Sequence, residues 1–347
     1  MNFSNKLVSW YQVNKRDLPW RNTTNAYYIW LSEIILQQTR VWQGTPYYLA
    51  FVNAYPKIED LANAPEDEVL KMWQGLGYYS RARNLHFTAK DIVVNYGGKF
   101  PNNYQEILKL KGVGSYTAAA ITSFAFGLPY AVVDGNVIRV LSRIFGVDTP
   151  YDTPLGKKQF QELAQELLIK ENSSVYNQAI MEFGALQCKP KSPDCSVCPM
   201  QDFCEAYNNN TIAELPVKSK KIKVKNRFLH FLMIEKKGKV YLGKRKSGIW
   251  QGLYEFPFLE FSDRINEKEL LSSEEWVDIF ADAKVEMQSI SPEFIHVLSH
   301  QKLYAKFWKV KTNDINLKNY QLIAKEELEN YPVSRLIEKY FETLKLT

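Results

Sequence analysis

A single carboxylate, Glu33, lies in the apolar and aromatic stretch YYIWLSEIILQQTR, residues 27–40, which has no lysine or arginine before Arg40. Burying an unpartnered charge is costly, so Glu33 faces water, pairs with a buried arginine, or has a chemical task. Apolar surroundings raise the pKa of a carboxyl group and keep its proton near neutral pH. The stretch is therefore a candidate site for a general acid.

A second carboxylate, Asp134, follows an apolar run and precedes Gly135 and Asn136 in the stretch YAVVDGNVIRVLSR. An aspartate at this place is a good N-cap for the helix that follows, which is a sufficient structural reason for it. In functional terms it is a second carboxylate beside Glu33. Two carboxyl groups in environments of different polarity can divide the tasks of acid and anion.

All four cysteines of the chain are clustered with the spacing C-x6-C-x2-C-x5-C. Four clustered thiolates are typical of a metal centre, either zinc or an iron–sulfur cluster, whereas disulfides are rare in the cytosol. Zinc ribbons usually pair two C-x2-C knuckles about fifteen to twenty residues apart, and this chain has one such pair. The expected ligands are Cys188, Cys195, Cys198 and Cys204.

The stretch LKLKGVGSYTAAA places Gly112, Val113 and Gly114 between two segments with helical patterns. Glycines let the backbone turn tightly, and the first N–H groups of the second helix could then bind a phosphate. A simple helix–turn–helix corner explains this segment equally well.

The composition is that of an ordinary folded protein with about two domains: 347 residues, 46% hydrophobic and 24% charged. No window approaches eighteen apolar residues, and the N-terminus lacks the apolar core of a signal peptide. We therefore expect a cytoplasmic protein that has no membrane partner. The net charge of +6 favours an acidic partner only mildly.

Helical signals dominate residues 1–205. Pro46 and Pro65 are expected at first helical positions. Gly75 and Gly77 are expected to end the helix that follows Pro65.

The pattern changes after residue 207. Residues 208–226 are polar and then rich in lysine, as in a linker. Two β-rich runs flank Lys237-Gly238 and predict a hairpin. Alternation over residues 303–310 predicts a strand, and residues 333–344 have the pattern of an amphipathic helix. An α+β part thus follows an all-α part.

Taken in order, these motifs resemble the helix–hairpin–helix DNA glycosylase superfamily. They are an acidic residue before LQQT, then GLGYYSRARNLH, LKGVGSYTA, VVDGNVIRV and the cysteine cluster. Within the superfamily, the chain is most similar to the A/G-specific adenine DNA glycosylases of the MutY family. The resemblance extends to GIWQGLYEFP and HVLSH near the C-terminus, and so covers essentially the whole chain.

The resemblance implies a multidomain fold, with an all-α helix–hairpin–helix glycosylase core, an iron–sulfur cluster loop and a C-terminal α+β Nudix-like domain. The expected domains are a six-helix domain over residues 22–133, a cluster domain formed by 1–21 and 134–207, a linker over 208–226, and the Nudix-like domain over 227–347. The cysteines would then bind one [4Fe-4S] cluster. The expected partner is double-stranded DNA with 8-oxoguanine:adenine or guanine:adenine mispairs, bound by a monomer that associates with the nucleoid.

The resemblance also implies a chemistry. Adenine is a poor leaving group until its N7 is protonated, a step that we assign to Glu33, which would later activate water. Asp134 would stabilise or trap the oxocarbenium-like sugar. Tyr116 and Asn136 would hold hydrogen bonds around this pair. Arg16, Arg21 and Gln178 resemble residues that line the adenine pocket.

A base must leave the duplex before its glycosidic bond can be reached. Leu36 would wedge into the gap, while Gln38 and Thr39 would contact the strand that has lost its partner. By resemblance, Gln38 and Thr39 also contact the opposite 8-oxoguanine, together with Tyr78.

The C-terminal part resembles a Nudix hydrolase but has no run of the G-x5-E-x7-R-E-x2-E-E type after Gly252. Without these carboxylates it should not hold a catalytic magnesium ion, so we predict binding without hydrolysis. Ser299 and His300 match the loop by which the family recognises 8-oxoguanine.

Two other functions compete with this interpretation. Endonuclease III, a pyrimidine glycosylase and lyase, has a nucleophilic lysine where this chain has Tyr116, and a phenol cannot form a Schiff base. Borohydride trapping on damaged duplex separates the two activities. The third possibility is a catalytically inactive iron–sulfur module that binds DNA or transfers electrons, which would have no use for Glu33 and Asp134.

Overall fold

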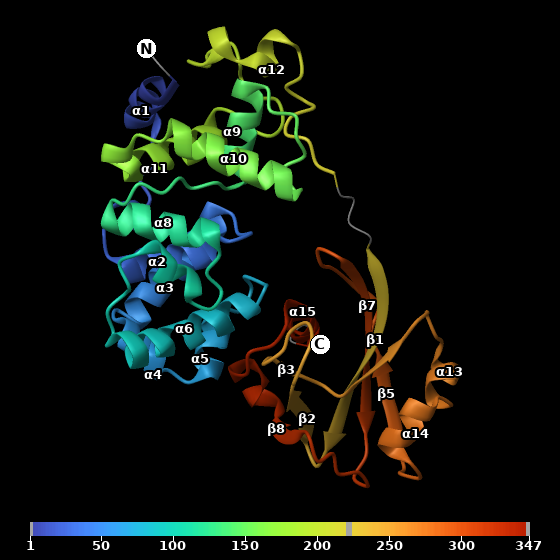
Figure 1. Cartoon of the computed structure of the whole chain (residues 1–347). Coiled ribbons are helices and arrows are strands. Elements are labelled where there is room, and N and C mark those ends of the chain that lie inside the picture. The colour runs from blue at the N-terminus through green and yellow to red at the C-terminus, as the bar shows by residue number, and fades with distance from the viewer. Residues whose placement is uncertain (1–2, 220–223, 345–347) are drawn as a thin grey trace. The chain divides into compact units, whose positions relative to one another are not determined.

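The computed structural model describes residues 3–219 and 224–344, and the chain forms two compact units (Figure 1). The first unit comprises Met1–Asn63 and Asn84–Lys220, and the second comprises Ala64–Arg83 and Lys221–Thr347. The short segment Ala64–Arg83 therefore packs with the C-terminal part of the chain. Residues 220–223 of the predicted linker lie outside the described residues. The predicted domain boundaries remain predictions.

The described residues of the first unit are helical, as predicted, and contain no strand. Their helices are α1 (Phe3–Asn14), α2 (Ala26–Leu36), α3 (Val41–Ala54), α4 (Ile58–Asn63), α6 (Ser80–Tyr96, whose first four residues belong to the second unit), α7 (Tyr104–Lys109), α8 (Ser115–Phe126), α9 (Gly135–Phe145), α10 (Pro154–Leu167), α11 (Ser173–Leu186) and α12 (Glu205–Asn208). One apolar core joins α1, α9, α10 and α11 through side chains such as Leu7, Leu141, Phe160 and Phe183. This core fixes the beginning of α9, where Asp134 lies.

The proline signals locate helix starts only in part. Pro65 is the N-cap of α5 (Glu66–Met72), one residue before the helix, and Gly75 and Gly77 follow that helix with positive φ. The prediction for Pro46 was wrong, because Pro46 lies inside α3, which begins at Val41. A proline inside a helix removes one backbone hydrogen bond, and this one lies at an exposed position of the helix.

The second unit is built on a mixed eight-stranded sheet (Figure 1). The central pair, β1 (Lys225–Lys236) and β7 (Gln301–Lys311), is parallel, and the other pairs are antiparallel. The predicted hairpin and strand are confirmed, since Lys236 pairs with Lys239 across Lys237-Gly238 and β7 contains residues 303–310. The remaining strands are β2 (Lys239–Lys244), β3 (Tyr254–Glu255), β4 (Phe258–Phe261), β5 (Glu286–Ile290), β6 (Phe294–Val297) and β8 (Gln321–Ala324).

Helices cover both faces of the sheet, so β1 and β7 are buried on both sides. On one face, Phe231 and Phe307 join a core that includes Leu336 of α15 (Arg335–Leu344), the predicted amphipathic helix. On the other face, Leu232 and Trp308 pack in a core with side chains of α13 (Glu267–Leu271) and α14 (Glu274–Phe280). Alternate residues of one strand thus serve two cores.

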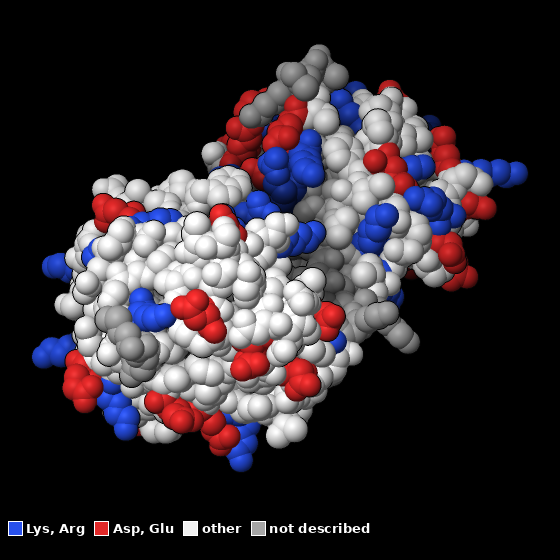
Figure 2. Space-filling view, turned by 90° about the horizontal axis from the view of Figure 1, so that it is seen from above, with Lys and Arg blue, Asp and Glu red and all other residues white. Residues whose placement is uncertain are grey.

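The face shown in Figure 2 is mixed in charge, with basic and acidic side chains interspersed between broad uncharged areas. Among the described residues, no helix combines the length and the apolar character that crossing a bilayer requires.

One close helix contact gives a test of this packing. A Cβ atom added at Gly184 of α11 would lie 2.7 Å from the Cβ and 2.8 Å from the carbonyl oxygen of Asn136 at the start of α9. We expect Gly184→Ala to lower the free energy of unfolding by about 1–3 kcal/mol, because overpacking forces the two helices apart. Urea denaturation followed by circular dichroism measures this. Gly135→Ala is the control, since an added Cβ there meets nothing within 4 Å; equal stability of the two variants would contradict the prediction.

Candidate active site

Glu33 lies in α2, which is buried on nearly all sides. Asn25 caps this helix by accepting a hydrogen bond from the Tyr27 N–H at 2.9 Å. Glu33 itself is only 7% exposed. Burial raises the pKa of the Glu33 carboxyl to about 7 against a lowering hydrogen bond from Tyr116, while the nearby Asp134 raises that pKa and Arg21 lowers it. The predicted proton-holding carboxyl group is therefore in a suitable place.

Asp134 is the N-cap of α9, as its position in the sequence suggested. Its Oδ1 accepts hydrogen bonds from the N–H groups of Asn136 and Val137, both at 2.8 Å. Its Oδ2 accepts a third, from the Asn136 side-chain amide at 2.7 Å. Burial raises the pKa of Asp134, and the hydrogen bonds from Val137 and Asn136 oppose this rise. These donors favour the carboxylate form in a partly buried place.

Tyr116 connects the two carboxyl groups. It lies near the start of α8, and its hydroxyl makes a hydrogen bond with the Glu33 carboxyl. Burial, with the charges of Glu33 and Asp134, raises the pKa of Tyr116 well above its usual value, so the phenol remains protonated. The structure thus brings together all four predicted catalytic side chains, Glu33, Asp134, Tyr116 and Asn136.

A second buried glutamate, Glu182 of α11, holds the two arginines predicted for the adenine pocket. Arg16 donates to it at 2.9 and 2.6 Å, and Arg21 at 3.0 and 2.8 Å. The Glu182 side chain is 1% exposed. Burial alone would raise the pKa of Glu182, but the hydrogen bonds from Arg16 and Arg21 lower it to about 2.

Sequence analysis did not identify Glu182, although it carries the same signal as Glu33. It is a single carboxylate in the apolar stretch AIMEFGAL. Gln178 lies one turn earlier in α11 and accepts a hydrogen bond from the Tyr11 hydroxyl at 2.9 Å. The Arg21 guanidinium lies 5.7 Å from the centre of the Tyr11 ring. Arg16, Arg21 and Gln178 therefore belong to one polar group, and Glu182 is its centre.

The predicted wedge residues follow the end of α2. Leu36 is its last residue, Gln38 is exposed with a φ of 56°, and Thr39 is half-buried. A positive φ is uncommon for a residue other than glycine. Gln37 fixes the loop by donating to the Thr117 hydroxyl of α8 at 3.2 Å. The loop therefore presents Gln38 to solvent from a defined backbone.

The hairpin joins α7 and α8 as predicted. Gly112 has a φ of 82° and lies against Asn84, where an added Cβ would come within 2.8 Å of the Asn84 Cβ. The N–H of Val113 donates to the carbonyl of Leu110 at 3.1 Å, so it is used within the turn. Gly114 is the N-cap of α8 and leaves no side chain over the first N–H groups of that helix.

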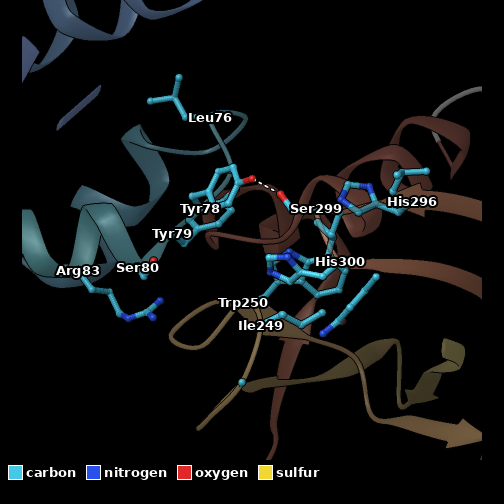
Figure 3. A pocket seen from close by; sticks show the side chains of 15 residues that line it. Leu76, Tyr78, Tyr79, Ser80, Arg83, Ile249, Trp250, His296, Ser299 and His300 are labelled. Atoms are coloured by element: carbon cyan, nitrogen blue, oxygen red, sulfur yellow. Dashed lines mark hydrogen bonds between the residues drawn. The ribbon is translucent and has the colours of Figure 1, made fainter. Parts of the chain in front are cut away.

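Tyr78, Ser299 and His300 line a cavity of 560 Å³ in the second unit. Figure 3 shows the hydroxyl groups of Tyr78 and Ser299 pointing toward each other, and they form a hydrogen bond. The indole of Trp250 forms another wall of this cavity. It packs edge-on against the His296 ring, with 5.7 Å between the ring centres. Tyr79 is a core residue, with 4% of its surface exposed.

The four cysteines lie near one another. Burial raises the pKa of Cys195, Cys198 and Cys204, and the charge of the nearby Cys188 raises the pKa of each of them further. Within the described residues, no three His, Cys, Asp or Glu side chains converge in a way that would hold one metal ion. Arg143 lies beside the loop, donating to the carbonyl of Lys189 at 2.7 Å and to the Cys188 sulfur at 3.5 Å. A group of four thiolates with an arginine beside it fits an anionic metal–sulfur cluster.

Three family models match the chain. Residues 31–168 match the HhH-GPD superfamily base excision DNA repair protein, residues 188–204 the iron–sulfur binding domain of endonuclease III, and residues 229–343 the NUDIX domain. The predicted helix–hairpin–helix core, cluster loop and Nudix-like domain are thereby confirmed. The four cysteines are the ligands of one [4Fe-4S] cluster.

Similar proteins of known name cover most of the chain. It is 35% identical to the adenine DNA glycosylase of Buchnera aphidicola subsp. Baizongia pistaciae, over 97% of this chain and 96% of that protein. It is 34% identical to the adenine DNA glycosylase of Mus musculus, over 87% of this chain and 69% of that protein. Among solved structures, a thermostable thymine-DNA glycosylase is 34% identical with a TM-score of 0.56, over 60% of this chain and 95% of that one.

The opposite pKa shifts of the two buried glutamates predict opposite effects on stability. Between about pH 4.5 and 7 the native protein keeps the Glu33 proton that the unfolded chain has released, so this group's contribution to stability falls as the pH rises. As the pH rises from about 5 to 8, we expect the free energy of unfolding of Glu33→Gln to increase by about 2–3 kcal/mol relative to that of the unmodified protein. Near pH 8, Glu182→Gln should have a free energy of unfolding about 2–4 kcal/mol lower than that of the unmodified protein, because Arg16 and Arg21 lose their charged partner.

Urea denaturation at about pH 5 and about pH 8 measures both effects. Parallel pH dependence of Glu33→Gln and the unmodified protein would contradict the assignment of a raised pKa to Glu33.

Proposed function

Since the chain belongs to the adenine DNA glycosylase family, we propose that it excises adenine paired with 8-oxoguanine or guanine in double-stranded DNA. Removal of adenine in base excision repair is the activity of the family, and the choice of the opposite base is the finer proposal. The observation that supports excision of adenine is the buried Glu33 beside Asp134 and Tyr116 within one unit. Because one chain supplies this whole group, the proposed active form is a monomer.

Glu33 is the proposed general acid. With a pKa of about 7, a large share of Glu33 is protonated at neutral pH. It donates this proton to N7 of a flipped adenine, the C1′–N9 bond breaks, and adenine leaves as a neutral base. The resulting Glu33 carboxylate then takes a proton from the water that attacks the sugar.

Asp134 is the proposed partner of the positive sugar. Hydrogen bonds from Asn136 and Val137 hold its carboxylate at the beginning of α9. From this fixed position it can stabilise the oxocarbenium-like sugar or form a covalent bond with C1′ that water later replaces. Tyr116 orients Glu33 but supplies no amine, so the proposed enzyme is a monofunctional glycosylase.

Arg16, Arg21 and Gln178 are proposed to line the adenine pocket, with Glu182 as their support. Since Glu182 binds both guanidinium groups, it also limits the effect of Arg21 on the Glu33 proton. A more mobile Arg21 could approach the Glu33 carboxyl and favour its ionised form. Glu182 would therefore help to keep Glu33 an acid.

The opposite base is proposed to meet two groups of residues. Leu36, Gln38 and Thr39 would fill the gap and contact the strand that lost its partner. The hairpin of Gly112, Val113 and Gly114 would bind a phosphate at the first N–H groups of α8, since the Val113 N–H is used within the turn. Tyr78, Ser299 and His300 would recognise 8-oxoguanine from the second unit. The cluster held by the cysteines has four protein ligands and no open position, so its proposed role is structural.

The choice of opposite base is tested by single-turnover release of adenine from duplexes with 8-oxoguanine, guanine or cytosine opposite adenine. We expect the fastest release opposite 8-oxoguanine, slower release opposite guanine, and very slow release opposite cytosine, since only oxidised guanine offers all the contacts of the Tyr78 and Ser299 pocket. Equal rates on all three duplexes would contradict the proposed specificity.

The acid is tested by Glu33→Gln and by the pH dependence of the rate. We expect Glu33→Gln to slow adenine release by about a hundred- to ten-thousand-fold, because an amide cannot donate the N7 proton. In the unmodified enzyme the rate should fall as the pH rises above about 7, where Glu33 loses its proton.

Glu166→Gln is a matched control, since it makes the same change at an exposed position of α10. DNA affinity measured by fluorescence anisotropy should remain unchanged in Glu33→Gln. Near-normal adenine release by Glu33→Gln would reject this assignment.

A further inference from the structure

We propose that Asp67 and Gln74 are positioning residues for the recognition of the opposite base. Their hydrogen bonds and ion pair hold the segment Ala64–Arg83 against the C-terminal part of the second unit, and these contacts position the Tyr78 side chain beside Ser299. The inference rests on the proposed function, in which Tyr78 contacts the base opposite adenine. Neither residue is assigned a contact with DNA.

Asp67 makes the first attachment, from α5 to the strands β2 and β3. Its Oδ1 lies 2.6 Å from the Lys244 ammonium, and its Oδ2 accepts a hydrogen bond from the Tyr254 hydroxyl at 2.9 Å. Lys244 also lies 3.7 Å from Glu66. Since both oxygens of one carboxylate are used, Asp67 fixes the direction of α5 as well as its distance from the sheet.

Gln74 makes the second attachment, just before the Tyr78 loop. Its amide nitrogen donates to Glu338 of α15 at 3.0 Å, and its amide oxygen accepts from the Val333 N–H at 3.4 Å. Tyr79, next to Tyr78, donates from its hydroxyl to the Val333 carbonyl at 3.3 Å. The loop is therefore held on the side that leads into it and on the far side of Tyr78.

Tyr78, in the loop between these attachments, has a strained backbone with a φ of 46°. Gly75 and Gly77 before it have φ values of 99° and 70°, which glycine adopts without strain. A tyrosine with positive φ costs about 1–2 kcal/mol, and such a conformation persists only where the surroundings hold it. Tyr78 is 49% exposed, so little packing of its own side chain opposes relaxation.

The hydrogen bond between Tyr78 and Ser299 depends on this arrangement (Figure 3). If α5 and the following loop are released, Tyr78 can leave the left-handed region and its hydroxyl loses Ser299. Recognition of the opposite base should then weaken. The acid site should not respond, because Glu33, Asp134 and Tyr116 all belong to the first unit.

The test compares Asp67→Ala with Glu68→Ala. Glu68 is the next residue of α5, carries the same charge and is exposed, and its side chain makes no hydrogen bond or ion pair among the described residues. We expect Asp67→Ala to lower the ratio of single-turnover rates on 8-oxoguanine:adenine and guanine:adenine duplexes by about three- to ten-fold. The rate on the guanine:adenine duplex should stay unchanged, and Glu68→Ala should leave both rates unchanged.

Lys244→Ala removes the same ion pair from the other side and serves if Asp67→Ala fails to fold. It should lower the same ratio, and the double variant should lose no more than the larger of the two single effects, since both substitutions remove one attachment. An unchanged ratio in both single variants overturns the inference alone. A ratio of one in the unmodified enzyme overturns the proposed function, and this inference with it.

Discussion

The free-energy cost of ionising a carboxyl group that is buried away from water determines the chemistry of the first unit. Glu33 lies inside a helix that is buried on nearly all sides, so the protonated form of its carboxyl group is favoured up to a pH of about 7. Its neighbours act in opposite directions. Asp134 adds a like charge that makes ionisation of Glu33 less favourable, whereas the hydrogen bond from the Tyr116 phenol lowers the Glu33 pKa and opposes burial only in part. An acid can thus exist beside an anion, because each carboxyl group has its own set of donors.

Glu182 shows that burial alone does not decide the outcome. Both glutamates are almost inaccessible to solvent, yet one has a pKa of about 7 and the other of about 2. The difference comes from the guanidinium groups of Arg16 and Arg21, which provide four hydrogen bonds to Glu182 from side chains. Glu182 is thereby unsuited to donate a proton and suited to hold cations in place. The two roles, acid and support, follow from the partners rather than from the residue type.

Local signals in the sequence predicted much of the fold, and contacts between distant residues account for what they missed. The cap at Asp134, the tight turn before α8, the turn at Lys237-Gly238 and the cysteine spacing each depend on neighbouring residues, so they could be identified. Glu182 had the same apolar surroundings as Glu33, but its arginines lie more than 160 positions away in the sequence. Likewise, no local pattern indicates that Ala64–Arg83 packs with the C-terminal part, because its attachments join residues about 180 or more positions apart.

The proposed acid site and the pair formed by Tyr78 and Ser299 therefore lie in different units. The residues proposed to break the bond belong to the first unit, whereas Tyr78 and Ser299 meet in the second. This separation explains why the Nudix-like domain can lack the carboxylates of a hydrolase: its proposed task is to bind, and a magnesium site would add negative side chains beside a polyanionic substrate. It also suits the packing of Ala64–Arg83 with the C-terminal part of the chain. Tyr78, which lies within the glycosylase part of the sequence, is thereby held beside Ser299 in the second unit, where both are proposed to contact the same base.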